Sequence, residues 1–390
     1  MGKRGPGSRT GDRSGRQRRV APWLRAALLL TTALMPLVAG AGERLFIVGQ
    51  DLGAVRDYHA SGCCPVPDGN TSYISLWKLT DPTLGYGGLG IDVSGEPMDQ
   101  EWDFTAGPAN LWKVANDFPG GLAIGLSMTE NHNPQALDLL LEGAFDPHIR
   151  RLAQFLKQVE GPVWLRIGYE FEGAWNQGYS NAERYVACWR HVVDLLRAEG
   201  VDNTQFVWQA STSPIDDIID GGRDEIRRWY PGDGYVDWMG ISWFLHPDAV
   251  PADSVAYRPP TQRELVEEFL AFARERGKPV MIAETAPQGY DLLRGFRANI
   301  GAVWDGPSRE AETPKTPDEI WDEWFEPLFA FIKANQDVIR AVAYINANWD
   351  SQDMWDAPYE SGFWGDTRLQ VSPELAERFS AAIDAWRATP

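Results

Sequence analysis

We expect the chain to fold as a single (β/α)8 barrel, and three observations predict this fold class. Short runs rich in β-branched and aromatic residues recur eight times, with amphipathic segments typical of helices between them. No stretch rich in Pro, Gly or Ser divides this alternation. The length of 390 residues exceeds an ordinary single domain, but an α/β barrel can fill it alone. A doubly wound sheet is the alternative that the same alternation allows.

The expected elements follow one another in chain order. The strands are the apolar runs at residues 45–50, 72–79, 122–128, 162–170, 205–210, 236–244, 279–285 and 340–348. Helical spacing of apolar residues predicts helices at 146–160, 181–199, 261–276, 317–335 and 373–388. Ser372 and Pro373 open the last helix with a capping residue and a proline in its first turn. The stretches without clear periodicity, which we expect to be loops, are 51–71, 80–120 and 286–316.

The composition excludes several classes of protein. With 44% hydrophobic and 23% charged residues, the chain is not mostly disordered. Its formal net charge of -19 makes it a poor partner for nucleic acid, because phosphates would be repelled. The 18 tryptophans fit either a heavy core or flat faces that contact sugar rings.

The N-terminal segment, residues 1–41, is predicted to be a secretory signal. Eight Lys and Arg residues lie within residues 1–25, followed by an apolar run at 26–40 that ends in an A-x-A pattern at Ala41. This run is too short, and too interrupted by Pro36, for a stable membrane span. We therefore expect a secreted or periplasmic protein whose barrel domain is 42–390. An uncleaved anchor is the alternative, and the Arg18-Arg19 pair leaves a twin-arginine signal open.

We expect no cofactor or metal, and this expectation rests on the cysteines, the histidines and one glycine-rich run. Cys63, Cys64 and Cys188 allow one disulfide at most, between either of the first two and Cys188 or between the adjacent pair, or three free thiols. The histidines have no metal-binding spacing. The run GYGGLG at 85–90 matches a dinucleotide fingerprint literally, but the IDVSGEP that follows is no helix, so we expect a loop.

The segment 162–170 is the most informative part of the chain. Side chains alternate along a strand, so Trp164, Arg166, Gly168 and Glu170 are expected to face the barrel interior. Burying such charges is costly unless they are paired or used. Glu170 ends the strand, where barrel enzymes place catalytic groups. A purely structural Arg–Glu pair is the alternative, and Glu172 is the main rival to Glu170 because it shares the inward parity.

A second apolar run, 279–285, also carries a glutamate near its end, Glu284. Two carboxylates at the strand ends of one barrel suggest glycoside hydrolysis. One protonates the leaving oxygen and the other attacks the anomeric carbon, if they lie about 5–5.5 Å apart. Arg166 beneath them would hold one carboxylate ionised by its opposite charge.

Four blocks in correct order carry a family resemblance: WLRIGYEFEGAWN, FVWQASTSP, YPGDGYVDWMGISWF and KPVMIAETAPQG. The chain resembles clan A glycoside hydrolases and is most similar to family 26, the family of β-mannanases and some xylanases and β-glucanases. The resemblance implies a retaining mechanism on a β-linked glycan, with mannan favoured. It implies that Glu170 is the acid/base and Glu284 the nucleophile. Tyr169 stands where family 26 usually has His.

Residues next to the strand ends are candidates for binding a polysaccharide or oligosaccharide. They comprise Arg166, Tyr169, Trp175, Asn176, Trp243, His246, Trp349, Asp51, Glu130 and His132. Tryptophan rings suit the faces of pyranose rings, and polar neighbours bind hydroxyls. Gln209 and Ser211 end another strand and are candidates for the floor of the site. A transglycosylase on the same scaffold and a non-catalytic polysaccharide-binding protein are the alternative functions.

Overall fold

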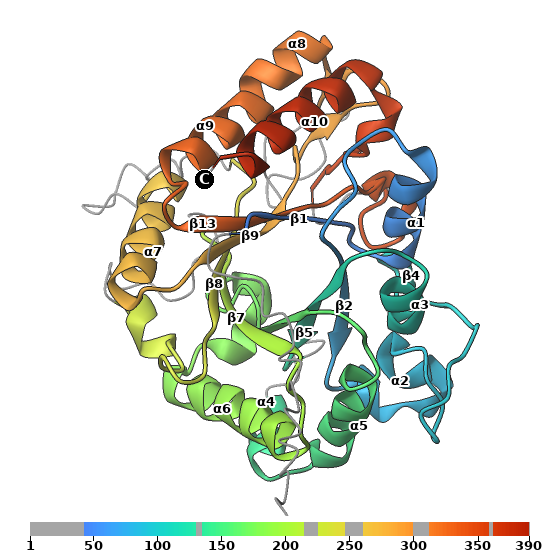
Figure 1. Cartoon of the computed structure of the whole chain (residues 1–390), viewed down its shortest axis with the longest axis vertical. Coiled ribbons are helices and arrows are strands. Elements are labelled where there is room, and N and C mark those ends of the chain that lie inside the picture. The colour runs from blue at the N-terminus through green and yellow to red at the C-terminus, as the bar shows by residue number, and fades with distance from the viewer. Residues whose placement is uncertain are drawn as a thin grey trace, which may run out of the picture. The chain divides into compact units, whose positions relative to one another are not determined.

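The structure is a computed structural model, and it describes residues 43–129, 135–213, 225–245, 260–298, 312–358 and 362–389. These residues lie in one compact unit, Leu37–Pro390. Eight parallel strands close into a barrel in the order β1-β13-β9-β8-β7-β6-β5-β2, and helices form a ring around it (Figure 1). The predicted (β/α)8 barrel is therefore confirmed, and the closed sheet excludes the doubly wound alternative.

The eight barrel strands coincide with the eight predicted runs, with shifted ends. They are β1 Leu45–Val48, β2 Gly69–Ser75, β5 Gly121–Ser127, β6 Val163–Ile167, β7 Thr204–Ala210, β8 Trp238–Ser242, β9 Val280–Thr285 and β13 Ile339–Tyr344. The prediction of 72–79 for the second strand was wrong by three residues at its start and four at its end. Gly69–Ser75 pairs in register with Gly121–Ser127, and the Ser75 hydroxyl then accepts from the Lys78 N–H and starts a 3-10 turn. The short strands outside the barrel are β3 Trp102–Asp103, β4 Pro108–Ala109, β10 Tyr290–Asp291, β11 Phe296–Arg297 and β12 Thr313–Pro314.

All five predicted helices are present. The α-helices are α1 Leu52–Ser61, α2 Gly85–Gly88, α3 Leu111–Asn116, α4 Ala136–Leu141, α5 Asp146–Leu156, α6 Ala182–Ala198, α7 Gln262–Arg276, α8 Pro317–Ile320, α9 Glu326–Ala334 and α10 Pro373–Arg387. A π turn, η6 Trp321–Phe325, joins α8 to α9, so the predicted helix 317–335 is continuous. The 3-10 turns are η1 Lys78–Thr80, η2 Pro82–Leu84, η3 Ala174–Tyr179, η4 Glu225–Trp229, η7 Trp349–Ser351 and η8 Leu369–Val371.

Helix α1 corrects the expectation of a loop over 51–71. Asp51 caps its N-terminus by accepting from the Ala54 N–H, and Gly62 ends it in a left-handed conformation. Both are ordinary helix boundary residues. The helix lacks a strong apolar stripe, and this is why periodicity did not reveal it. Residues 85–90, by contrast, form no strand-to-helix turn: Tyr86 and Gly87 are left-handed within the single turn α2.

Two layers of core hold the barrel together. The interior is filled by Trp164, Trp238, Met281 and small residues from the other strands, which form one buried cluster. A larger cluster lies between strands and helices and includes Trp189 and Trp208. The prediction that Trp164, Trp189 and Trp208 are packing residues is confirmed. The inner cluster is made of slender side chains on most strands, so the broad Trp164 fits there, and Arg166 lies above it.

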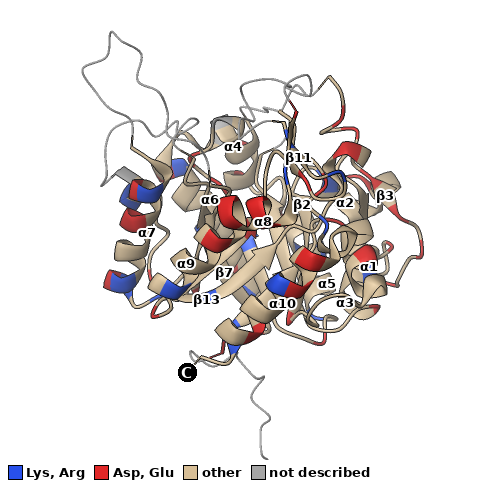
Figure 2. Cartoon of the chain, turned by 90° about the horizontal axis from the view of Figure 1, so that it is seen from above, with Lys and Arg blue, Asp and Glu red and all other residues tan. Residues whose placement is uncertain are grey.

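Charged residues lie mainly on the helices and loops outside the barrel, with both signs on α7 and acidic residues on α8 (Figure 2). Within the described ranges, no helix is long and apolar enough to cross a membrane. All three cysteines are free thiols. Cys188, on α6, is buried with its sulfur against the Leu137 carbonyl at 3.3 Å, so neither predicted bridge to it has formed.

Candidate active site

Strand β6 ends three residues earlier than predicted, and the chain turns sharply before Glu170. Gly168 and Glu170 both adopt left-handed backbone, with φ of 51° and 52°. A Cβ on Gly168 would lie 2.7 Å from the Met128 side chain and 2.8 Å from the Tyr185 ring, so this left-handed position favours glycine. The Asn176 amide donates to the carbonyls of Tyr169 and Glu170 at 3.1 and 2.8 Å and holds this turn. Glu170 thus reaches the site through a strained turn rather than along the strand, as functional residues often do.

Arg166 and Glu284 form a buried ion pair inside the barrel. Nη1 of Arg166, which is 1% exposed, donates to Oε1 of Glu284 at 2.6 Å. Nη1 also donates to the Gln209 amide oxygen at 2.9 Å, and Nη2 to the Thr71 hydroxyl at 3.2 Å. The guanidinium carbon lies 4.7 Å from the centre of the Tyr73 ring. Arg166 was expected to lie beside one of the two carboxylates, and the carboxylate that it contacts is Glu284.

Glu170 has a different environment. The Ser242 hydroxyl donates to Oε1 of Glu170 at 2.6 Å, and the Trp175 indole N–H donates to Oε2 at 3.1 Å. Ser242 in turn accepts from the Gln209 amide at 3.0 Å, and the same amide donates to Oε1 of Glu284 at 3.0 Å. Ser242 and Gln209 therefore link the two carboxylates through hydrogen bonds.

The register of the strands explains how these groups meet. A register shift in the β8–β9 pair follows Ile241 and places Ser242 beside Glu284. Ser242 is a site residue that the sequence analysis missed. It shares the inward parity of Trp238, so strand alternation predicts that Ser242 faces the barrel interior, although not that it lies beside Glu284.

The electrostatics of the two glutamates differ. Burial, followed by the negative charge of Glu284, raises the pKa of Glu170 well above its ordinary value, while the hydrogen bond from Ser242 opposes this rise. Burial therefore favours the protonated form of Glu170, whereas Glu284 is paired with the Arg166 guanidinium. Two carboxyl groups in such different environments suit the roles of acid and nucleophile.

Replacing Ser242 by Ala tests this account of Glu170. The variant loses a hydrogen bond that favours the ionised form, so the pKa of Glu170 should rise further. We expect the alkaline limb of the kcat/KM profile to move up by about one pH unit. The measurement is the pH dependence of hydrolysis for wild type and Ser242→Ala. A limb that stays in place, or that moves to lower pH, would contradict the assigned contact.

The structure brings four predicted binding residues to the two glutamates. Arg166 contacts Glu284, and Trp175 and Asn176 contact Glu170, as described. Tyr169 packs edge-on against Tyr73 with ring centres 5.4 Å apart. Trp243 is not brought to the site. Its ring stacks on Phe331 at 5.9 Å and faces the helices, because it follows Ser242 and takes the opposite parity. Three further predicted residues, Glu130, His132 and His246, lie outside the described residues.

Trp349 lies within an aromatic cluster beyond the end of β13, together with Phe244 and Ala286. It is 3% exposed, and its ring centre is 4.6 Å from that of Trp364 and 5.3 Å from that of Trp355. Its indole N–H donates to the Thr367 hydroxyl at 3.1 Å. The ring is therefore buried against other tryptophans, and its role in binding sugar stays a prediction.

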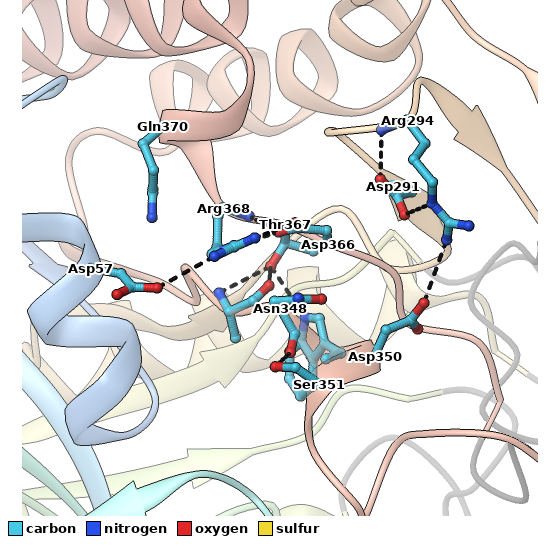
Figure 3. A network of polar contacts seen from close by, with 12 residues as sticks. Asp57, Asp291, Arg294, Asn348, Asp350, Ser351, Asp366, Thr367, Arg368 and Gln370 are labelled. Atoms are coloured by element: carbon cyan, nitrogen blue, oxygen red, sulfur yellow. Dashed lines mark hydrogen bonds and ion pairs between the residues drawn. The ribbon is translucent and has the colours of Figure 1, made fainter. Parts of the chain in front are cut away.

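A polar network surrounds this cluster and fixes the loops that follow β13 (Figure 3). Arg368 pairs with Asp366 at 2.8 Å and reaches Asp57 on α1 at 3.3 Å. Arg294 reaches Asp350 at 3.5 Å. These contacts join α1 and the β10–β11 hairpin to the segment that carries Trp349, and they stabilise one rim of the barrel mouth.

Asp51, predicted to bind substrate, has a structural part in the same rim. Its carboxylate is 5% exposed, accepts from the Ala54 N–H at 3.0 Å and accepts from the Gln352 amide at 3.0 Å. It thus joins the start of α1 to the loop that follows β13. Burial raises the pKa of Asp51 to about 6, against the lowering effect of the Ala54 and Gly53 N–H groups.

Replacing Asp51 by Asn should therefore change how stability depends on pH. The folded-state pKa lies above the ordinary value of 3.8, so the contribution of the protonated carboxyl is complete below pH 3.8 and is lost as the pH rises through about 6. Asn does not titrate. Between pH 4 and 7 the variant should gain up to ~3 kcal/mol of unfolding free energy relative to wild type. Urea unfolding of both proteins at the two pH values checks this, and a constant difference between them would contradict it.

The protein is thus a closed (β/α)8 barrel with two buried glutamates beside strand ends, an arrangement that glycoside hydrolysis can use. Residues 128–276 match the model of glycosyl hydrolase family 26, and this match confirms the predicted kinship of the chain with that family. The matched residues include Arg166, Glu170, Gln209 and Ser242. Glu284 lies beyond the matched range.

Two curated relatives extend the similarity over most of the chain. A β-1,3-xylanase TXYA from Vibrio sp is 34% identical over 342 residues, which are 87% of this chain and 64% of the relative. A β-1,3-xylanase from Alcaligenes sp is 34% identical over 343 residues, which are 87% of this chain and 63% of the relative. The chain thus spans under two thirds of the length of either relative.

Solved structures share the fold at lower identity. The catalytic domain of a family 26 endo-β-1,4-mannanase from Bacillus sp. JAMB-750 has a TM-score of 0.52 and 17% identity, and covers 89% of this chain and 87% of that domain. A family 26 β-mannanase from Bacteroides ovatus has a TM-score of 0.50 and 14% identity, and covers 89% of this chain and 90% of that protein.

Proposed function

We propose that the chain is a retaining glycoside hydrolase that cleaves a β-linked polysaccharide, with Glu170 as acid/base and Glu284 as nucleophile. The observation that carries the proposal is the contrast between the two buried carboxyl groups. Glu170 accepts from neutral donors and has a raised pKa, while Glu284 pairs with the buried Arg166.

The contacts support a specific order of events. Oε1 of Glu284 accepts from both Arg166 and Gln209, which leaves Oε2 for the anomeric carbon. As Oε2 attacks, Glu170 protonates the leaving glycosidic oxygen, and a glycosyl-enzyme forms. The negative charge of Glu284 is then lost, so the pKa of Glu170 falls. Ionised Glu170 can take a proton from the incoming water, which releases the sugar with retained configuration.

Among β-glycans, we propose β-1,3-xylan as the first substrate to test. Both relatives that cover 87% of this chain are named β-1,3-xylanases. The mannanases are similar at 17% identity or less in the two structures compared, and so support only the fold. The mannan preference drawn from the family resemblance therefore stays a prediction, as does export directed by residues 1–41.

A reducing-sugar assay of the purified protein tests the function. The panel holds β-1,3-xylan, β-1,4-xylan, mannan, glucomannan, and β-1,3- and mixed-linkage glucans, with Glu284→Gln as the matched control. We expect release from β-1,3-xylan that the control lacks. Release from mannan alone would keep the mechanism and overturn the substrate. Binding without release from any polymer would favour a non-catalytic binding protein, and longer oligosaccharide products at high substrate concentration would favour a transglycosylase.

A further inference from the structure

A third buried carboxylate lies two residues after Glu170. Glu172 is 3% exposed, and its Oε1 accepts from the backbone N–H of Thr212 at 2.7 Å. Phe171, between the two glutamates, faces the helices and stacks on Trp208 with ring centres 4.9 Å apart. Burying a carboxylate is costly unless strong hydrogen bonds compensate for the lost hydration. The hydrogen bond from Thr212 to Glu172 therefore holds both residues in the conformation seen here.

The partner of Glu172 is itself in an unusual conformation. Thr212 follows β7 and has a φ of 52°, which a β-branched residue rarely adopts and which needs support from its surroundings. Its hydroxyl donates to the carbonyl of Ser242 at 2.7 Å. The Ser242 side chain donates to Glu170. Glu172, Thr212 and Ser242 therefore form a chain of contacts that returns to Glu170.

We propose that Glu172 is a positioning residue for the proton donor: it holds the left-handed turn at Thr212 and, through Thr212, the hydroxyl of Ser242 against Glu170. The inference rests on the proposed function, in which Glu170 is the acid/base. The anchor spans three loops at the carboxyl ends of β6, β7 and β8, so it keeps Glu170 and Ser242 in place while the substrate enters and leaves.

The charge of Glu172 adds a second effect. Burial and Glu284 are the main causes of the raised pKa of Glu170, and the negative charge of Glu172 raises it further. Removing this charge should move the alkaline limb of the kcat/KM profile to lower pH, opposite to the shift expected for Ser242→Ala. This shift reports the charge of Glu172, whereas the loss of kcat in variants that break the contacts of Glu172 and Thr212 reports the positioning role.

Four variants of the full chain separate these contributions. Glu172→Gln keeps an oxygen that accepts from the Thr212 N–H and removes the charge. We expect its kcat to stay within about 10-fold of wild type and the alkaline limb of its kcat/KM profile to lie about half a pH unit lower. Glu172→Ala removes the anchor as well, and kcat should fall about 10- to 100-fold. Thr212→Val loses the hydroxyl contact at nearly equal shape, and kcat should fall several-fold, whereas Thr212→Ser should stay near wild type. If Glu172→Ala does not fold, the other three variants still decide.

Azide rescue with an activated aryl glycoside distinguishes positioning from acid/base catalysis. A small anion can replace the base only where the acid/base carboxyl itself has been removed, so Glu170→Ala should regain turnover and Glu172→Ala should not. Rescue of Glu172→Ala alone would overturn both this inference and the proposed role of Glu170. An unchanged pH limb in Glu172→Gln together with unchanged kcat in Thr212→Val would overturn this inference and leave the proposed function standing.

Discussion

Glu170→Ala should lower kcat on the polysaccharide by about 10²- to 10⁴-fold, the usual contribution of general acid–base catalysis. The reason is that Glu170 supplies the proton to a poor leaving group and later removes one from water. On an aryl glycoside with an activated leaving group the first step needs no acid, so the loss should be much smaller there. Steady-state kinetics on both substrates measure the contrast.

The matched control for this prediction is Glu170→Gln, which keeps the shape and the contacts with Ser242 and Trp175. It should fold with wild-type stability and lose activity on the polymer to a similar extent. Equal losses on the polymer and on the activated substrate would contradict the assignment. Near-normal activity of either variant would exclude Glu170 as the acid/base altogether.

Arg166→Met should cost about 3–5 kcal/mol of unfolding free energy at neutral pH, because it leaves the Glu284 carboxylate buried without its counter-charge. Catalysis should fall steeply as well, since Arg166 also holds Glu284 in place through the hydrogen bond to its Oε1. Urea denaturation at neutral pH measures the loss of stability, and the rate of hydrolysis measures the loss of catalysis.

An exposed ion pair offers the control. Arg274 pairs with Asp337 at 2.7 Å, with side chains 40% and 59% exposed, so Arg274→Met should cost under about 1 kcal/mol. Arg166→Lys keeps the charge but loses the planar guanidinium that reaches both Gln209 and Thr71. Its free energy of unfolding should lie between those of wild type and Arg166→Met. If Arg166→Met and Arg274→Met lost similar amounts of unfolding free energy, the buried ion pair would contribute no more to stability than the exposed one.

Much of the fold could be predicted from the sequence, because parallel strands that are covered on both faces consist of short apolar runs. Boundaries were less accurate where apolar residues continue past the strand. The run 72–79 continues with Leu76 and Trp77 beyond the strand, and the pairing with β5 ends at Ser75. Helix α1 was missed because its boundaries rest on two capping residues rather than on an apolar stripe.

The site was predicted where local rules suffice and missed where contacts depend on distant register. Arg166, Glu170 and Glu284 stand out because charges at inward or strand-end positions are expensive. The position of Ser242 beside Glu284 depends on the register of β8 against β9, with its shift after Ile241, and no local pattern encodes this. The place of Trp243, by contrast, follows from a local rule, because strand alternation alone directs its ring toward the helices.

The most direct test of the central claim is to trap the glycosyl-enzyme. The protein would be incubated with a 2-deoxy-2-fluoro glycosyl fluoride of the sugar that the polymer panel identifies, then digested and analysed by mass spectrometry. We predict one added glycosyl group, on Glu284, and none in Glu284→Gln. A label on another carboxylate, or unlabelled enzyme whose first product has inverted anomeric configuration, would contradict the two-glutamate retaining mechanism.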